Sequence, residues 1–206
     1  MMKAIIFDVD GTMLDTERAQ LKALQQVLEQ HDLMYTMDEL RVVFGIPGKD
    51  ALKRLGVENI NEVHKEWDKA VEVYMDEVQL FYGVEEALKT LTAQGVKLGI
   101  VTSKTRVQFV NEFQPFGLND YFASIITAED APKTKPDPAP LQLCLTELAV
   151  APAEAIYVGD TIFDYQCAKG AGVPFALALW GAHSTKGMDD AAYRLETAEE
   201  ITNIIV

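Results

Sequence analysis

Short runs of apolar residues recur along the chain, and each of the first four is followed by polar residues or by Gly or Pro. Runs of this length predict buried β-strands. They cover Ala4–Phe7, Leu98–Val101, Ser124–Ile126, Ala155–Val158 and Phe175–Leu179. Apolar positions at helical spacing predict helices at about residues 106–116, 140–148, 163–171 and 198–205. This alternation predicts an α/β fold of the doubly wound, Rossmann-like type with a mostly parallel sheet.

A long connection interrupts this alternation between the first two predicted strands. A simple crossover needs about a dozen residues, whereas residues 8–97 intervene here. Apolar residues in this stretch fall on two helical faces. One face has Leu21, Leu24, Val27 and Leu28, and the other has Ile60, Val63, Trp67, Ala70, Val71, Tyr74 and Val78. The sequence therefore predicts a helical insertion at residues 16–80, with residues 1–15 and 81–206 forming the sheet domain.

Two pairs of acidic residues follow predicted strands. Asp8 and Asp10 come directly after the first strand, and Gly11 then allows a sharp turn. Asp160 and Asp164 follow the fourth strand in a similar way. Carboxylates crowded at the ends of buried strands are electrostatically costly unless a cation or a proton is shared there. A hard divalent cation with oxygen ligands would remove that cost.

Hydroxyl and lysine side chains follow the other strand ends. Thr102 and Ser103 come after the second strand, and Lys133 and Lys135 come after the third. In an open α/β sheet, these carboxyl ends form the ligand-binding edge. One carboxylate can act as a nucleophile and another as an acid, while hydroxyl and lysine groups hold phosphoryl oxygens. The combination predicts phosphoryl transfer assisted by a metal ion.

Four motifs built from these residues resemble those of the haloacid dehalogenase superfamily. They are Asp8-Val9-Asp10-Gly11-Thr12, Val101-Thr102-Ser103-Lys104, Lys135-Pro136-Asp137-Pro138 and Gly159-Asp160 with Asp164. Their order and their places at strand ends match the superfamily, whose members carry a cap where this chain has its helical insertion. The resemblance covers essentially the whole chain. It implies a Rossmann-like catalytic core at residues 1–15 and 81–206 and a helical cap at residues 16–80.

The resemblance implies a role for each of the four acids. Asp8 would attack phosphorus and become an aspartyl phosphate. Asp10 would protonate the leaving group and then activate the water that hydrolyses the intermediate. The Asp8 side chain, the Asp10 backbone carbonyl and Asp160 would coordinate Mg²⁺. Asp164 would support this metal site from behind the coordinating groups.

The resemblance also implies which groups bind the phosphoryl oxygens. Thr102 would hydrogen-bond the transferring phosphoryl group, with the Ser103 backbone close by. Lys135 would neutralise the negative charge on Asp8 and the phosphoryl group. Lys133 competes for this role, but Pro136 directly after Lys135 matches the family pattern and biases the preceding backbone towards an extended conformation.

Several positions distinguish the branches of the superfamily. Its dehalogenases and phosphonate hydrolases lack a carboxylate at the position of Asp10, which argues against C–halogen and C–P chemistry. The β-phosphoglucomutase branch usually has an aliphatic residue at the position of Thr12, a histidine just after Asp15 and an arginine in the cap loop. Residues 17–20 contain no histidine, and residues 45–50 contain no arginine. The pattern favours a phosphatase similar to phosphoglycolate phosphatase that acts on a small phosphorylated metabolite, with a β-phosphoglucomutase-like enzyme or a sugar phosphatase as alternatives.

The cap loop offers one candidate substrate contact. Gly48-Lys49 superficially suggests a nucleotide P-loop, but no glycine stands five residues before Gly48, and Asp50 replaces the Ser or Thr. Lys49 is either a solvated surface lysine or a contact for the far end of the substrate, beside backbone N–H groups at a helix start.

Composition narrows the choice of partners and location. The formal net charge of −14 argues against nucleic acid or an anionic membrane as a partner. Cys144 and Cys167 lack the spacing of a metal knuckle or a redox pair, so reduced thiols are expected. No apolar stretch approaches the ~20 residues that span a bilayer, and the segment before Asp8 is too short for a signal-peptide core. We therefore expect a cytoplasmic protein that is monomeric or weakly dimeric.

Two other classes of function share parts of this pattern. A signalling receiver also combines Mg²⁺, an acceptor aspartate, a threonine and a lysine on an α/β sheet. Receivers, however, lack a large insertion after the first strand and carry the acceptor aspartate on a later one. An inactive member of the superfamily would serve as a binding or regulatory protein, but every residue that the chemistry requires is present. Turnover of a generic aryl phosphate separates an enzyme from both.

Overall fold

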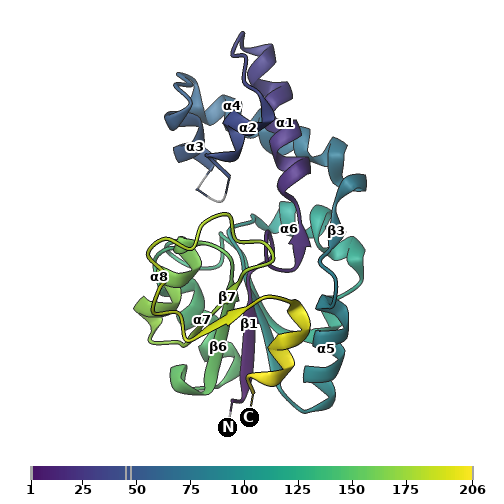
Figure 1. Ribbon diagram of the computed structural model, residues 1–206, viewed down its shortest axis with the longest axis vertical. Coiled ribbons are helices and arrows are strands. Elements are labelled where there is room, and N and C mark those ends of the chain that lie inside the picture. Colours follow the sequence, from purple (N-terminus) through teal and green to yellow (C-terminus); the bar gives the residue numbers. More distant parts are fainter. Residues whose placement is uncertain (1, 45, 47, 206) are drawn as a thin grey trace. The chain divides into compact units, whose positions relative to one another are not determined.

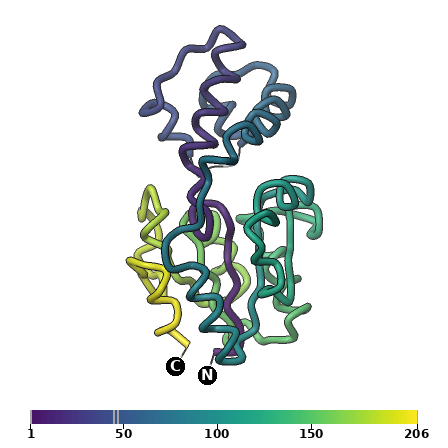
Figure 2. Tube along the Cα trace, turned by 90° about the vertical axis from the view of Figure 1, so that its right-hand side faces the viewer, coloured from purple at the N-terminus to yellow at the C-terminus, as the bar shows by residue number. Residues whose placement is uncertain are grey.

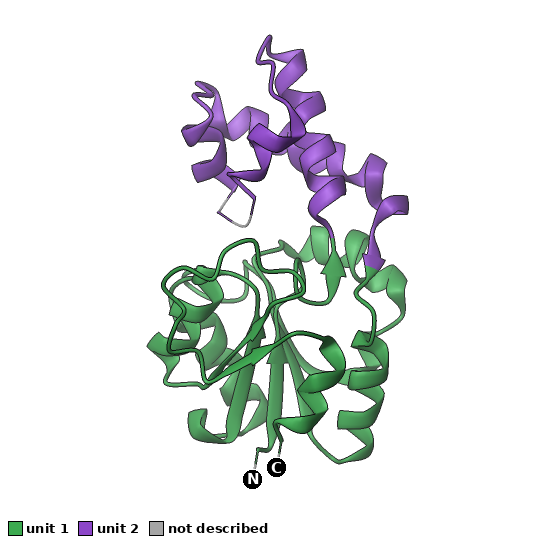
Figure 3. Cartoon of the chain, in the orientation of Figure 1, with its two compact units in different colours: residues 1–15, 80–206 green, residues 16–79 purple. Residues whose placement is uncertain are grey.

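The chain divides into two compact units in the computed structural model, which describes residues 2–44, 46 and 48–205. The sheet unit contains Met1–Asp15 and Leu80–Val206, and the helical unit contains Thr16–Gln79 (Figure 3). Leu80 therefore belongs to the sheet unit, whereas the sequence predicts it at the end of the helical insertion.

A six-stranded parallel sheet forms the centre of the sheet unit. The strands are β1 (Ala4–Phe7), β4 (Lys97–Val101), β5 (Phe122–Ile126), β6 (Ala155–Gly159), β7 (Phe175–Ala178) and β8 (Tyr193–Leu195). Their order is β5-β4-β1-β6-β7-β8, and each neighbouring pair is parallel. The chain first adds β4 and β5 on one side of β1 and then β6, β7 and β8 on the other. This is the doubly wound arrangement that the sequence predicts, and it puts β1 between β4 and β6.

Helices cover both faces of this sheet (Figure 1). On one side lie α7 (Ala139–Leu148) and α8 (Ile162–Ala171), and on the other lie α5 (Val84–Ala93) and the 3₁₀-helix η5 (Ala198–Asn203). The remaining elements are α6 (Arg106–Glu112), η2 (Gln114–Phe116), η3 (Asn119–Tyr121) and η4 (Pro152–Glu154). Buried side chains of β1, β4, β6 and β7 join those of α7 and α8 in one apolar core. This burial is the main force that holds the strand ends in place.

Several elements differ from the sequence prediction. Helix α5 and the edge strand β8 were absent from the predicted elements, and β5 begins at Phe122, two residues earlier than expected. The helix predicted at residues 106–116 stops as an α-helix at Glu112 and continues as η2. Pro115 explains the change, because proline has no N–H for an α-helical hydrogen bond. The predicted C-terminal helix is the 3₁₀-helix η5.

The helical unit has an apolar core of its own. The unit consists of α1 (Glu17–Gln30), α2 (Met37–Arg41), α3 (Gly48–Arg54), α4 (Ile60–Val71) and the 3₁₀-helix η1 (Glu72–Glu77). Both predicted helical faces contribute to this core, and Trp67 packs against it. The indole N–H of Trp67 donates to the Gln20 carbonyl (3.0 Å), so this aromatic residue helps to hold the helical unit together. No helix in the described part of the chain has the length and apolar character that crossing a membrane requires.

Two short strands form the connections between the units. The chain leaves the sheet unit after β2 (Leu14–Asp15) and returns through β3 (Gln79–Leu80) (Figure 2). β2 and β3 pair with each other in a separate two-stranded sheet. The insertion is therefore attached to the rest of the chain through two short extended segments.

Candidate active site

The candidate active site lies at the carboxyl ends of neighbouring strands of the large sheet. Asp8 follows β1, and its backbone N–H donates to the Val158 carbonyl of β6 (2.9 Å). Thr102 follows β4, and its N–H donates to the Ile126 carbonyl of β5 (3.0 Å). These hydrogen bonds continue the sheet ladder by one residue. The rigid sheet therefore determines where the Asp8 and Thr102 side chains begin, and both residues are buried.

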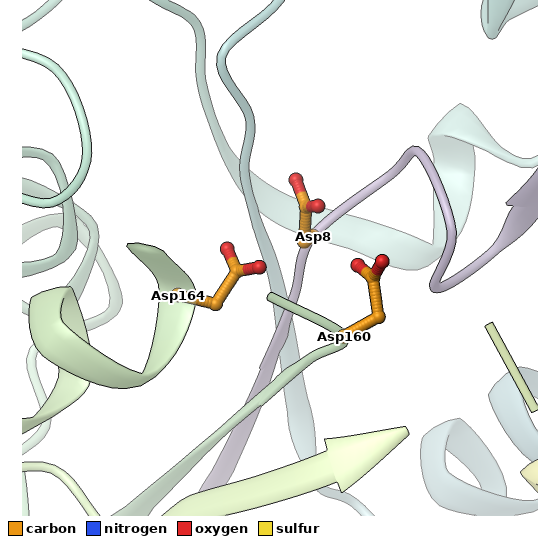
Figure 4. A group of neighbouring side chains, drawn as sticks. All are labelled: Asp8, Asp160 and Asp164. Carbon is orange, nitrogen blue, oxygen red and sulfur yellow. The ribbon is translucent and has the colours of Figure 1, made fainter. Parts of the chain in front are cut away.

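Three buried carboxylates lie close together at this edge (Figure 4). Asp8, Asp160 and Asp164 each contribute one oxygen to a set in which all oxygens lie within 4.8 Å of one another. Burial raises the pKa of Asp8 to about 7 in spite of the nearby Lys135 ammonium, and Asp164 adds to the increase. Burial also raises the pKa of Asp160 well above its ordinary range, again with a contribution from Asp164. A divalent cation would stabilise these carboxylates in their charged form, and an all-oxygen donor set fits Mg²⁺.

Neighbouring backbone and hydroxyl groups hold two of these carboxylates in place. Asp164 lies in the first turn of α8, where its Oδ2 accepts the Thr161 N–H (3.1 Å) and also the Thr161 hydroxyl. The Thr161 hydroxyl oxygen in turn accepts the Asp164 N–H (3.3 Å), which completes a capping box. Asp160 Oδ1 accepts the Thr12 hydroxyl (3.1 Å). The start of α8 therefore orients Asp164, and the turn after β1 orients Asp160.

A buried lysine crosses the acidic cluster. Lys135 Nζ is 2.7 Å from Asp8 Oδ1 and 2.7 Å from Asp164 Oδ1. Burial alone would lower the pKa of Lys135, but Asp164 and Asp8 raise it above its ordinary value. Lys133, the competing candidate, has a side chain that is 72% exposed and pairs with Asp137 (3.0 Å). The structure therefore brings Lys135 to Asp8 and leaves Lys133 at the surface.

Tyr157 is a buried residue of this site for which the sequence predicts no role. Its hydroxyl lies within hydrogen-bond distance of the Val101 carbonyl (3.0 Å) and of Asp164 Oδ1 (2.9 Å), and it accepts from Lys135 Nζ (3.3 Å). The residue lies within β6, where its apolar neighbours make it look like an ordinary core residue. A polar hydroxyl in a strand that is otherwise apolar is the one signal that the sequence contains.

Asp10 lies next to a second buried lysine. Asp10 Oδ1 is 2.9 Å from Lys104 Nζ, and Lys104 also pairs with Glu112. The side chains of Lys104 and Glu112 are 5% and 4% exposed, whereas that of Asp10 is 26% exposed. Burial alone would lower the pKa of Lys104, but Asp10 and Glu112 raise it above its ordinary value. Lys104 ends the motif Val101-Thr102-Ser103-Lys104, but the sequence predicts a role in the site neither for it nor for Glu112.

A second loop packs closely on the turn that follows Asp10. Gly11 has a φ of +76°, in the left-handed region that favours glycine. The indole N–H of Trp180 donates to the Thr12 carbonyl (3.0 Å). A Cβ atom at Gly181 would lie 1.7 Å from the Gly11 carbonyl oxygen, so the two backbones approach as closely as glycine allows. The loop with Trp180 and Gly181 therefore supports the turn that carries Asp10.

This contact leads to a prediction for Gly181→Ala. The added methyl group has no room, so the backbone at Gly11 or Gly181 has to move, and we expect the free energy of unfolding to fall by about 2 kcal/mol or more. Gly95→Ala is the matched control, because Gly95 also lies in the sheet unit but has open space around the position of a Cβ. Gly95 has a φ of +77°, so alanine there has to adopt a left-handed backbone conformation, which lowers the free energy of unfolding by about 1–2 kcal/mol. Chemical denaturation of both variants checks this, and a Gly181→Ala protein as stable as wild type would show that the two loops are not in contact.

The other predicted site residues lie outside the buried cluster. Ser103 is exposed at the end of β4. In the helical unit, Gly48 is the first residue of α3, and Lys49 is exposed in its first turn. Gly45 and Pro47 of the predicted cap loop fall outside the described residues. The roles of Ser103, Gly48 and Lys49 in substrate binding therefore stay predictions.

The arrangement contains the groups that phosphoryl transfer needs. Asp8 offers a carboxylate oxygen at the middle of the sheet edge, and Lys135 places a positive charge beside it. Asp10 has a partly exposed carboxylate, and a carboxyl group that solvent can reach is able to donate or accept a proton. Three crowded carboxylates can hold a metal ion, which would neutralise phosphoryl charge.

The chain resembles known proteins along almost its whole length. Residues 5–178 match the profile of a family described as haloacid dehalogenase-like hydrolase. Pyrophosphatase PpaX of Halalkalibacterium halodurans is 30% identical over 211 residues, which cover 99% of this chain and 97% of that protein. A phosphorylated carbohydrates phosphatase of Thermotoga maritima is 28% identical over 218 residues, which cover 99% of this chain and 98% of that protein.

A solved structure shares the fold. The crystal structure of a Lactobacillus plantarum protein, described as a "putative phosphoglycolate phosphatase", aligns with a TM-score of 0.93 at 28% sequence identity. The alignment covers 98% of this chain and 99% of that chain. The likeness in fold therefore extends over almost the whole chain, as the likeness in sequence does.

Proposed function

The chain belongs to the haloacid dehalogenase-like hydrolase family, and we propose that it is a Mg²⁺-dependent phosphatase that works through a phosphorylated Asp8. The observation that carries this proposal is the buried group of Asp8, Lys135, Asp160 and Asp164. It joins a nucleophile, a counter-charge and a set of oxygen donors for a cation at one edge of the sheet. The names of the two relatives support hydrolysis of a phosphate ester or anhydride.

Asp8 is the nucleophile in this mechanism. Its carboxylate oxygen forms a bond to phosphorus while the bond from phosphorus to the leaving oxygen breaks, which yields an aspartyl phosphate. Lys135, 2.7 Å from Asp8 Oδ1, offsets the negative charge that gathers on the carboxylate and the phosphoryl oxygens. The Thr102 hydroxyl and the Ser103 backbone bind the phosphoryl group and keep it in line with Asp8.

Mg²⁺ is the cofactor that we assign to this site. Asp8, Asp160 and the backbone carbonyl of Asp10 would hold the ion, and Asp164 would support the site from behind. When bound, the ion supplies positive charge that neutralises the phosphoryl oxygens. Thr12 holds the Asp160 carboxylate and the start of α8 holds that of Asp164, so these two groups are preorganised on rigid elements.

Asp10 moves the protons. In the first step, its carboxyl group gives a proton to the leaving oxygen, and the free alcohol or phosphate departs. In the second step, the Asp10 carboxylate takes a proton from a water molecule that attacks the aspartyl phosphate. That step releases inorganic phosphate and regenerates Asp8. With 26% of its side chain exposed, Asp10 is accessible to both the leaving group and the water.

We propose a small anionic substrate. The sheet unit binds only the phosphoryl group, which every phosphomonoester offers, so discrimination has to come from the part that covers the leaving group. We assign that role to the helical unit, which acts as a cap hinged at β2 and β3. Lys49 is the only cationic residue among residues 45–50. A small acidic leaving group such as glycolate, or the phosphate of pyrophosphate, therefore suits the cap better than a bulky neutral sugar.

A substrate panel tests the proposed function. The purified protein with Mg²⁺ is assayed for phosphate release from 2-phosphoglycolate, pyrophosphate, hexose phosphates, nucleotides and an aryl phosphate. We expect the highest kcat/KM for one of the two small anions. A preference for hexose phosphates would favour the sugar-phosphatase alternative, and isomerisation without net phosphate release would favour the mutase. No turnover of any compound would refute the phosphatase assignment.

The specificity role of Lys49 leads to a second prediction. Lys49→Ala should raise KM for the preferred anionic substrate by about tenfold, the loss expected for one charge-assisted contact. It should barely change the hydrolysis of an aryl phosphate that has no distal charge. Lys53→Ala is the matched control, because Lys53 lies on the same helix, α3, and is exposed. Equal effects of Lys49→Ala on both substrates, or no effect on either, would exclude Lys49 from substrate binding.

We also propose that the protein works in the cytoplasm as a monomer or weak dimer. Cys144 and Cys167 are buried free thiols, which suits a reducing compartment. The strongly negative net charge disfavours association with nucleic acid or an anionic membrane, so the partner that we assign is a small phosphorylated metabolite.

A further inference from the structure

A buried lysine next to the active site has no role in the mechanism above. The Lys104 ammonium is 2.9 Å from Asp10 Oδ1 and also pairs with the buried carboxylate of Glu112. Burying such charges is costly, and apolar residues of similar volume often stabilise a protein as well as a buried ion pair does. Stability alone therefore does not explain why Lys104 and Glu112 are buried as a charged pair. The contact between Lys104 and Asp10 suggests instead that Lys104 has a role in the reaction.

The backbone of Lys104 is held on both sides. Its N–H donates to the Thr102 hydroxyl oxygen (3.1 Å), and its carbonyl accepts the Ala128 N–H (2.9 Å). The next residue, Thr105, caps α6, which ends at Glu112. The Lys104 side chain therefore extends from an anchored position, with Glu112 balancing part of its charge. Anchored groups of this kind are able to hold a neighbouring side chain in one orientation.

We propose that Lys104 is a positioning residue that orients Asp10 for proton donation and so determines how well the enzyme hydrolyses esters with poor leaving groups. This inference rests on the proposed function, in which Asp10 is the proton donor. The Lys104 ammonium contacts Oδ1 of Asp10 (2.9 Å), and when Asp10 is protonated this leaves Oδ2 to carry the proton. As the bond between phosphorus and the leaving oxygen breaks, that proton moves to the leaving oxygen and Asp10 becomes an anion. The Lys104 ammonium stabilises this anion where it forms.

The test compares two substrates that need the proton to different extents. An alkyl phosphate has a poor leaving group that has to be protonated, whereas a nitrophenyl phosphate releases a stable anion without help. The quantity to compare is kcat/KM, because it covers only the steps up to departure of the leaving group. Lys104→Met should lower kcat/KM for the alkyl ester at least about tenfold more than for the nitrophenyl ester. That loss is a part of the 10²–10⁴-fold that general acid catalysis contributes.

Two further variants separate this role from a structural one. Lys104→Met alone leaves Glu112 buried without this partner, which is expected to lower stability. The double variant Lys104→Met/Glu112→Gln removes both charges, so we expect its Tm to recover while the selective loss on the alkyl ester persists. Lys89→Met is the control, because Lys89 also pairs with two carboxylates, Glu85 and Glu86, but lies exposed on α5. It should leave both rates unchanged.

The outcomes are distinct. Equal losses on both esters, or a double variant with the wild-type ratio of the two kcat/KM values, would overturn the positioning role and leave the proposed function intact. A wild-type protein that hydrolyses neither ester would overturn the proposed function and this inference with it. A loss confined to the alkyl ester in both Lys104 variants is the result that the inference requires.

Discussion

Replacing Asp8 with asparagine is expected to reduce phosphatase turnover to less than about 1% of wild type, because the covalent step then has no nucleophile. The substitution keeps the size of the side chain but removes the anionic oxygen that bonds to phosphorus. Folding should survive, since burial already opposes the charge on Asp8 and raises its pKa to about 7. Phosphate release and thermal unfolding, measured on the same preparation, check both parts. Acid quenching during turnover should also trap labelled phosphate on the wild-type protein and none on the variant.

Asp10→Asn is the companion variant that separates the two acids. It should bind phosphate almost normally but lose about 10²–10⁴ in rate, the range for a general acid and base. Asp190→Asn is the matched control, because the Asp190 side chain is 68% exposed and lies in no proposed catalytic group. Substantial turnover by Asp8→Asn, with Asp10→Asn fully inactive, would contradict the aspartyl-phosphate mechanism and make Asp10 the essential residue.

Removing divalent metal is the second change with a large expected effect. Activity should vanish in excess chelator and return with Mg²⁺, because the crowded carboxylates need a cation to carry their charge together. Mg²⁺ should also stabilise the fold, by about 2.7 kcal/mol at 100 times its Kd. For a chain of this size that corresponds to a rise in Tm of roughly 5–10 °C. Full activity in excess chelator would contradict the metal assignment.

The Mg²⁺ effect should grow with pH. The pKa of Asp8 is about 7 in the folded protein, against 3.8 for an unperturbed aspartate. Between these two pH values, Asp8 is protonated in the metal-free folded protein but ionised in the unfolded chain. Protonation of Asp8 therefore contributes to the free energy of unfolding. This contribution is fully present below about pH 4 and is lost as the pH rises through about 7. Mg²⁺ has to displace the proton. We therefore expect a larger increase in Tm at about pH 8 than at about pH 5.5.

Two variants check that the pH-dependent stabilisation comes from this site. Asp160→Asn should abolish most of the increase in Tm with Mg²⁺, because it removes one of the three negative charges of the buried set. Asp190→Asn should keep the full increase. An increase in Tm that is the same at both pH values, or that persists in Asp160→Asn, would place the bound ion elsewhere.

Much of the fold follows from local patterns in the sequence. Apolar runs of strand length, helical spacing of apolar residues and glycines at turns act over a few neighbouring residues, and they predict the parallel strands and the helical insertion. These local patterns did not predict every element. Helix α5 is absent from the predicted elements although its apolar residues recur at helical spacing, and β8 is too short to form a clear pattern. Pro115 ended an α-helix that periodicity alone extended to Phe116.

Part of the candidate site also follows from the sequence, and part depends on the folded structure. The order of motifs along the chain is sufficient to place acids, hydroxyls and lysines at strand ends, because parallel strands end at one edge of a sheet. Contacts between residues far apart in the chain needed the folded structure. Lys135 reaches Asp8 across 127 positions while Lys133 lies exposed. Pro136 favours Lys135 already in the sequence, but only the folded structure shows the contact with Asp8. Lys104 and Tyr157 likewise meet the acids only through packing, because long-range side-chain contacts depend on how strands and loops come together in space.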